Sequence, residues 1–264
     1  MNRSDIIRST EEIGFLPEQK FGQNFLCDEE MCDRIVGLCD FKKGDRVLEI
    51  GPGLGSLTSL LVSKGADLTC VEIDKRLAEY IDDHYSCRVF PNDYTKLKPE
   101  QYDASVYVNA VSNIPYYVMT PIMKKLLTEL KASDKLVLMV EKEALNRILA
   151  KPCTKQYGPL AILCALYGDI DVCFDLPGNL FYPAPKTVSS VITLTGGIKD
   201  NVDKDFTSFL DKAFGNRRKK LVNNIDSDKE TAVNILDKHG YGPDTRAEEI
   251  TPFDILMIYR DIIL

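Results

Sequence analysis

The chain has 264 residues, and its 33 lysines and arginines against 40 aspartates and glutamates give a formal net charge of −7 at pH 7. This length is ample for one catalytic domain with a buried core and a small appendage. No apolar stretch approaches the roughly 20 residues of a membrane span, and the N-terminal segment lacks a signal-peptide core. We therefore expect a cytoplasmic protein with no membrane partner.

Eight cysteines are spread along the chain without a C-x-x-C pair. Several lie in apolar periodic stretches, which indicates reduced core residues. A metal site could combine Cys27, Cys32 and Cys39 with His84 or His239, but these spacings fit no zinc template. We expect no metal.

Apolar periodicity in the first part of the chain predicts strands that alternate with helices. We expect helices over residues 28–39, 120–130 and 141–150, and strands over 46–50, 68–73, 87–90, 104–111 and 135–140. This alternation implies an α/β domain with a doubly wound, mostly parallel sheet. Ligands of such sheets bind beyond the carboxyl ends of the strands.

The first expected strand runs directly into a glycine-rich turn. Residues 46–58 read RVLEIGPGLGSLT, a β-branched run followed by Gly51, Gly53 and a helical pattern. Glycines let a ligand approach the backbone, and free N–H groups at a helix start favour a carboxylate or phosphate. Glu72 ends the next strand about 20 residues later, where an acid reaches a ribose diol. The G-x-G-x-G spacing predicts S-adenosylmethionine (SAM). A nicotinamide or flavin site and an ordinary glycine turn are the alternatives.

The tetrapeptide Asn113-Ile114-Pro115-Tyr116 follows the strand expected over 104–111. An adenine N6 amine is a poor nucleophile until acceptors on its N–H bonds draw the nitrogen toward tetrahedral geometry. Asn113 Oδ1 and the Ile114 carbonyl can supply these acceptors, because Pro115 biases the preceding residue to an extended conformation. Tyr116 can stack on the base. The pattern predicts methyl transfer to adenine, and the alternative is a tight turn.

Polar residues and glycines stand at or just after four of the expected strand ends: Gly51, Glu72, Asp93 and Asn113. Because these ends meet at one edge of a parallel sheet, we expect the four loops to form one crevice. Asp93 could accept a hydrogen bond from the cofactor's adenine or merely cap a turn.

An antiparallel pair of strands is expected over 170–174 and 188–194. Their connection contains Phe181 and two prolines that stiffen it, so Phe181 could face Tyr116 across a flipped base. The alternative is that Phe181 belongs to the core. From Gly196-Gly197 onward only short helical stretches appear. We therefore expect a SAM-binding catalytic domain over 1–196 and a small helical domain that contacts RNA over 197–264.

Positive charge is clustered despite the acidic total. Arg217, Arg218, Lys219 and Lys220 are consecutive, and Lys155 belongs to a basic middle segment. Such local patches bind phosphates. We expect these five residues to bind RNA, with a solvated helix face as the alternative.

The chain resembles the rRNA adenine N6-dimethyltransferase family throughout its length, and within it the type that modifies small-subunit rRNA. KFGQNFL (20–26) is similar to the family's cofactor lid, EIGPGLGSLT to its glycine loop, VEID (71–74) to its ribose acid and Asn92-Asp93 to its adenine-binding pair. NIPYY and the FxPxPKxxS stretch (181–189) resemble its catalytic and base-clamping loops.

The resemblance implies a Rossmann-like SAM-dependent methyltransferase sheet with a small C-terminal all-helical domain. It implies contacts with SAM from Asn24, Leu26, Gly51, Glu72, Asp93 and Asn113, to which we add Gly53 and Ile73. The target adenine is expected to be handled by Asn113, Ile114, Pro115, Tyr116 and Phe181.

Two segments distinguish the small-subunit type from related enzymes that methylate 23S rRNA and confer macrolide resistance. These are PCTKQYGPL (152–160) and FGNRRKKLVNN (214–224), in which Cys153, Gln156 and Asn216 depart from the usual pattern. We expect N6,N6-dimethylation of adenosines in 16S rRNA, within the small ribosomal subunit or its precursor, by a monomer. The alternatives are 23S rRNA methylation and a catalytically idle ribosome-assembly factor.

Overall fold

The computed structural model describes residues 1–17, 22–130, 133, 135–196 and 202–263. Two compact units emerge from its contacts, one of residues 1–142 and 169–197 and the other of 143–168 and 198–264. Lys20 and Phe21 of the expected lid, and Gly197 at the expected boundary, lie outside the described residues. The expected division at 196/197 needs one correction, because it leaves 143–168 in the first domain.

A seven-stranded sheet forms the centre of the first unit, in the order β4-β3-β2-β5-β6-β9-β7. Its strands are β2 (Arg46–Ile50), β3 (Asp67–Val71), β4 (Arg88–Phe90), β5 (Asn109–Asn113), β6 (Lys135–Glu141), β7 (Asp169–Leu176) and β9 (Ser189–Thr195). The five strands from β4 to β6 are parallel, and β9 runs antiparallel to both β6 and β7. The predicted doubly wound, mostly parallel sheet is confirmed.

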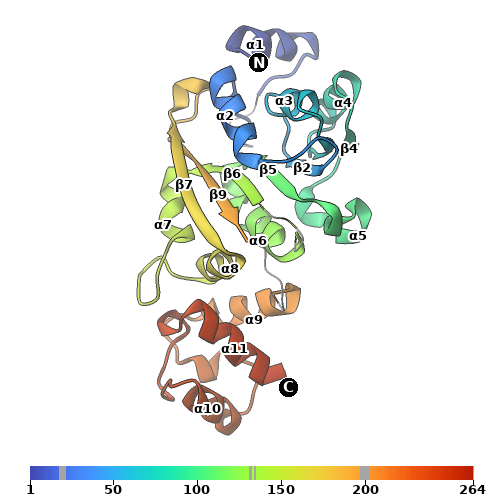
Figure 1. Cartoon of the computed structure of the whole chain (residues 1–264). Helices are drawn as coiled ribbons and strands as arrows, with labels where there is room; N and C mark the ends of the chain where they lie inside the picture. Colours follow the sequence, from blue (N-terminus) through green and yellow to red (C-terminus); the bar gives the residue numbers. More distant parts are fainter. Residues whose placement is uncertain (18–21, 131–132, 134, 197–201, 264) are drawn as a thin grey trace. The chain divides into compact units, whose positions relative to one another are not determined.

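Helices cover both faces of this sheet (Figure 1). On one face lie α2 (Glu29–Cys39), α3 (Thr58–Ser63) and α4 (Lys75–His84), and on the other α5 (Pro99–Tyr102) and α6 (Met119–Glu129). Alternate strand residues such as Val47, Val111 and Val137 share one hydrophobic cluster with α2 and α4. A sheet buried on both faces explains why its strands read as continuous apolar runs.

The strand expected over 104–111 begins later than predicted, at Asn109. Residues 104–106 instead form a 3-10 turn that follows Asp103, whose φ of 56° interrupts an extended chain. The strand continues to Asn113, so that this residue stands at its carboxyl end.

Two N-terminal elements were not predicted. Helix α1 (Arg3–Glu12) begins at Asn2, whose side chain and that of Asp5 form a capping box. Strand β1 (Phe25–Leu26) pairs antiparallel with β8 (Phe181–Tyr182) in a separate small sheet. The Arg3 guanidinium donates to the carbonyls of Asn179 and Phe181, which ties α1 to this sheet.

The second unit is helical: α7 (Leu145–Ile148), α8 (Pro159–Tyr167), α9 (Lys204–Gly215), α10 (Lys229–Lys238) and α11 (Pro252–Ile263). Helix α8 is apolar on nearly every side, so it requires partners all round, and α7, α9 and α11 supply them. Tyr157, just before α8, donates to the Ile250 carbonyl and packs edge-on against Phe214. These contacts explain why 143–168 joins the C-terminal helices.

Short 3-10 turns connect many of these elements: η2 (Tyr94–Lys96), η3 (Ala104–Val106), η4 (Tyr116–Val118), η5 (Lys142–Ala144), η6 (Gly178–Leu180), η7 (Leu221–Asn223) and η8 (Ala247–Glu249). Across the described ranges, no helix is long and apolar enough to cross a membrane.

Candidate active site

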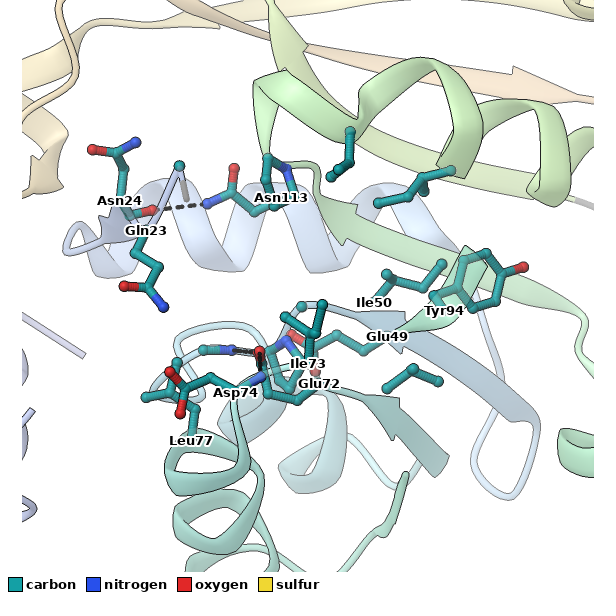
Figure 2. Close-up of a pocket in the computed structure, with 18 of the residues that line it drawn as sticks. Gln23, Asn24, Glu49, Ile50, Glu72, Ile73, Asp74, Leu77, Tyr94 and Asn113 are labelled. Atoms are coloured by element: carbon teal, nitrogen blue, oxygen red, sulfur yellow. Dashed lines mark hydrogen bonds between the residues drawn. The ribbon is translucent and has the colours of Figure 1, made fainter. Parts of the chain in front are cut away.

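A cavity of about 520 Å³ opens at the carboxyl ends of the parallel strands (Figure 2). The four loops that follow β2, β3, β4 and β5 all contribute to its wall. The structure thus brings together all of the residues expected to contact the cofactor: Asn24, Leu26, Gly51, Gly53, Glu72, Ile73, Asp93 and Asn113. We call it the first cavity.

The glycine turn after β2 has the conformation that its sequence requires. Gly51 and Gly53 have φ values of 70° and 59°, which L side chains rarely adopt. A Cβ atom on Gly53 would also lie 2.8 Å from the ring of Phe25. Close packing of the N-terminal segment over the turn therefore leaves no room for a side chain.

Glu72 is held rigidly at the end of β3, with only 5% of its surface exposed. Its Oε2 accepts from the Gly53 N–H at 3.1 Å and its Oε1 from the Asp74 N–H at 3.0 Å (Figure 2). Burial raises the pKa of this carboxyl, and the backbone hydrogen bonds oppose that rise. Each carboxylate oxygen keeps acceptor capacity for a further donor, such as a ribose hydroxyl.

Glu49, which the sequence interpretation did not include, also lines the first cavity. It is only 2% exposed, and its Oε2 accepts from the Thr58 hydroxyl at 2.7 Å and the Cys70 thiol at 3.7 Å. Burial, with a smaller contribution from the charge of Glu72, raises the pKa of Glu49 to about 7. Its position two residues before Gly51 was the available signal.

Asp93 fits both of its proposed roles. Its Oδ1 accepts from the backbone N–H and the hydroxyl of Thr95, so it caps η2. Burial is the largest single effect on the pKa of Asp93 and raises it, but the hydrogen bonds from Thr95 and the interaction with Lys96 together outweigh burial and hold this pKa below its usual value. The same residue lines the first cavity, where an ionised carboxylate can accept further hydrogen bonds.

The amide of Asn113 is fixed by the N-terminal segment. Its Nδ2 donates to the Asn24 carbonyl at 3.0 Å, which leaves Oδ1 as the acceptor end of the amide (Figure 2). Gly22 packs against the next turn, where a Cβ would lie 3.1 Å from Pro115 Cβ. Asn24 Oδ1 is buried and has no hydrogen-bond partner within the described part of the chain. A bound ligand with a donor group would satisfy it.

A second cavity, of about 390 Å³, adjoins the first. The two share Gly22, Asn24 and Tyr117. Tyr116 lines the second cavity, and its hydroxyl shares a hydrogen bond of 2.7 Å with Ser189 Oγ. Ile114 is buried and donates its N–H to the Met139 carbonyl, so only its carbonyl could serve a substrate. Asn113 and Tyr116 of one tetrapeptide thus line adjoining cavities.

The prediction that Phe181 clamps a base opposite Tyr116 is wrong for this structure. Phe181 is 1% exposed and packs in the hydrophobic core with Phe25 and Leu26. Its place in β8, opposite Leu26 of β1, turns the ring inward. Leu26 is buried in the same cluster, although it also lines the first cavity.

The expected RNA-binding residues fall into two groups within the second unit. Arg217 donates to Glu248 at 2.7 Å and to the carbonyls of Thr154 and Lys155, so it has a structural role that the sequence did not reveal. Lys220 pairs with Asp244. The side chains of Lys155, Arg218 and Lys219 are exposed, as is that of Lys220 despite its ion pair.

Comparison with known proteins gives consistent matches over nearly the whole chain. The model of the ribosomal RNA adenine dimethylase family matches residues 15–263. Ribosomal RNA small subunit methyltransferase A of Malacoplasma penetrans is 36% identical over 245 residues, which cover 89% of this chain and 88% of that protein. The protein of the same name from Natranaerobius thermophilus is 33% identical over 276 residues, with 93% and 91% covered.

Solved structures show the same fold. A dimethyladenosine transferase from Plasmodium falciparum has a TM-score of 0.69 at 21% identity, covering 89% of this chain and 95% of that one. The 23S rRNA methyltransferase ErmE has a TM-score of 0.59 at 21% identity, covering 91% and 100%.

Burial of Phe181 predicts its effect on stability. Phe181→Ala should lower the free energy of unfolding by about 3–5 kcal/mol, because it removes a core ring and leaves a cavity. Phe253→Ala is the matched control, since Phe253 is 64% exposed, and should change stability by less than about 0.5 kcal/mol. Urea denaturation measures both. Equal, small effects of the two substitutions would indicate that Phe181 is exposed and would support its role as a base clamp.

Because the pKa of Glu49 is raised, we expect the free energy of unfolding of the unliganded protein to fall when this group ionises. Ionising this group is disfavoured, so its contribution to stability is full below its ordinary pKa of 4.5 and is lost as pH rises through about 7. That shift corresponds to about 3 kcal/mol above pH 7. Glu49→Gln keeps the acceptor for Thr58 without the charge.

Thermal unfolding should therefore show Glu49→Gln more stable than wild type at pH 8 and nearly equal to it at pH 4.5. Glu100→Gln, at an exposed position in α5, is the control. A stability difference that does not change with pH would contradict the assigned cost.

Proposed function

The chain belongs to the ribosomal RNA adenine dimethylase family, and we propose that it dimethylates N6 of adenosines in 16S rRNA, within the small ribosomal subunit or its precursor. The observation that carries this proposal is the Asn113 amide on the wall of the first cavity, whose nitrogen is held by the Asn24 carbonyl, while Asn24 itself lines both cavities. One cavity then holds the methyl donor and the other the target base.

SAM is the cofactor, and it supplies an electrophilic methyl group when bound. The first cavity offers partners for each part of it. Glu72 can accept from the ribose hydroxyls and Asp93 from the adenine amino group, while Ile73, 60% exposed on the wall, can pack on the adenine face. Gly51 and Gly53 allow the methionine carboxylate to approach the backbone. The buried, unsatisfied Asn24 Oδ1 would gain a donor.

Catalysis in this site depends on orientation and local electrostatics. Asn113 Oδ1 and the Ile114 carbonyl accept the N6–H bonds, which frees the nitrogen lone pair from the ring. The Tyr116 ring, fixed through Ser189, packs on the base in the second cavity. No strong general base is required, because the N6 proton becomes acidic only as the new bond forms. After one transfer an N–H remains for the same acceptors, which permits the second.

The second unit is proposed to hold the ribosomal substrate through the exposed side chains of Lys155, Arg218 and Lys219. Arg217 is better described as a positioning residue for the neighbouring loop, because its donors are used on Glu248 and two carbonyls. Since the chain is acidic overall, naked duplex RNA should bind weakly and the assembled particle well.

Specificity for 16S rRNA is tested by incubating the protein and labelled SAM with unmodified 30S particles, unmodified 50S precursors and naked rRNA. Mapping should place label at N6 of adenines in 30S particles alone. Label in 23S rRNA would assign the chain to the enzymes of macrolide resistance. Binding to 30S particles without any label would favour an idle assembly factor.

Asn113→Ala should lower the single-turnover rate of methyl transfer at least ~100-fold, because it removes an oriented acceptor that acts in the transition state. Its unfolding midpoint should stay close to that of wild type, since Asn113 is only part-buried. Asn234→Ala on the exposed face of α10 is the control. A rate within threefold of wild type would reduce the tetrapeptide to a structural turn.

Measurements of 30S binding at several salt concentrations and of protein stability should distinguish the basic residues that contact RNA from those with a structural role. Arg218→Ala and Lys219→Ala should each weaken 30S binding and reduce the slope of log K against log salt by about 1, with stability unchanged. Arg217→Ala should instead lower the free energy of unfolding by about 1–2 kcal/mol, through lost charged hydrogen bonds that are partly screened by solvent. If Arg217→Ala reduced the salt slope at constant stability, Arg217 would belong to the RNA contact.

A further inference from the structure

The second cavity contains two charged side chains that the methyl-transfer chemistry leaves unassigned. Glu141 stands at the carboxyl end of β6, and Lys186 belongs to the segment before β9. Both line the second cavity beside Tyr116, and neither lines the first. Glu141 is half-buried, whereas Lys186 is exposed at the rim.

The sheet register fixes how far Glu141 lies from the reacting end of the site. Asn113 of β5 pairs with Met139 of β6, so Glu141 is two residues further toward the strand's carboxyl end. At ~3.3 Å per residue along the strand and ~4.8 Å between strands, the two backbones are about 8 Å apart. The ribose is attached on the side of the purine opposite N6, so a base that lies along this direction with N6 at Asn113 brings its ribose toward Glu141.

The chemistry of a carboxylate narrows what Glu141 can bind. An ionised carboxylate only accepts hydrogen bonds. An adenosine within an RNA chain offers two kinds of donor, its N6–H bonds and its 2′-hydroxyl, since its 3′ and 5′ oxygens are esterified. In the proposed function the N6–H bonds are engaged at Asn113, which lines the first cavity. The 2′-hydroxyl is the donor left for Glu141.

We propose that Glu141 accepts a hydrogen bond from the 2′-hydroxyl of the target adenosine, and that Lys186 pairs with a phosphate flanking it. The second cavity then selects a ribonucleotide over a deoxyribonucleotide at the target position, since the 2′-hydroxyl is the group that distinguishes RNA from DNA. This inference rests on the proposed function, because it assumes that the second cavity receives the target base.

A double-mutant cycle between protein and substrate tests the contact with Glu141. Wild type and Glu141→Ala act on 30S particles reconstituted with 16S rRNA that carries either adenosine or 2′-deoxyadenosine at the target position. Glu141→Ala should lower kcat/KM on the ribose substrate about 10- to 100-fold, as expected for a charge-assisted hydrogen bond. Replacing the ribose substrate by the deoxy substrate should lower the rate of wild type by a similar factor. The same replacement should not lower the rate of Glu141→Ala any further.

Equal losses for Glu141→Ala on both substrates would overturn the inference. A loss that persists on the deoxy substrate but disappears on an N6-methyladenosine target would overturn it too, by assigning Glu141 to N6. Methylation of the all-ribose particle by wild type establishes the proposed function independently of either result. Glu143→Ala makes the same charge change at an exposed position outside both cavities and controls for long-range attraction of RNA.

Lys186 is tested separately, because a phosphate contact affects binding rather than orientation. Lys186→Gln should raise KM for the particle and lower the salt slope of binding by about 1, with the rate at saturation unchanged. Its loss should be the same on ribose and deoxy substrates. A lower rate at saturation with unchanged binding would remove Lys186 from the phosphate contact.

Discussion

One hydrogen bond, from Asn113 Nδ2 to the Asn24 carbonyl, joins the parts of this site that come from distant segments. It links the end of a central strand to the N-terminal segment, which the pairing of β1 with β8 holds in place. It also determines which end of the Asn113 amide is available as an acceptor. Asn24 lines both cavities, so the proposed cofactor site and the proposed base site share one short segment.

The site contains two buried carboxylates whose charges the unliganded protein accommodates poorly. Burial raises the pKa of both Glu49 and Glu72, although Glu49 accepts from the Thr58 hydroxyl and the Cys70 thiol and Glu72 accepts from backbone N–H groups. A ligand with hydroxyl and ammonium donors would complete their coordination. Desolvation of these carboxylates lowers the stability of the empty site, and hydrogen bonds from the cofactor would relieve it and so strengthen cofactor binding. Such destabilised groups are common at functional sites.

The sequence predicted those features that depend on local pattern and on strand direction. Apolar runs bounded by glycines predicted β2 and β3. Because parallel strands end at one edge of a sheet, the sequence alone also predicted that Gly51, Glu72, Asp93 and Asn113 line one crevice. Features that depend on tertiary packing were not predicted. Phe181 is in the core because β8 pairs with a two-residue strand too short to recognise, and Arg217 is engaged by Glu248, far along the chain.

A crystal structure of the protein with S-adenosylhomocysteine bound tests the central claim most directly. The account predicts the nucleoside in the first cavity with its ribose hydroxyls on Glu72, and the sulfur atom near Asn113 Oδ1, with the Asn113 to Asn24 hydrogen bond preserved. An Asn113 amide turned so that its nitrogen faces the sulfur, or a ribose bound away from Glu72, would contradict it.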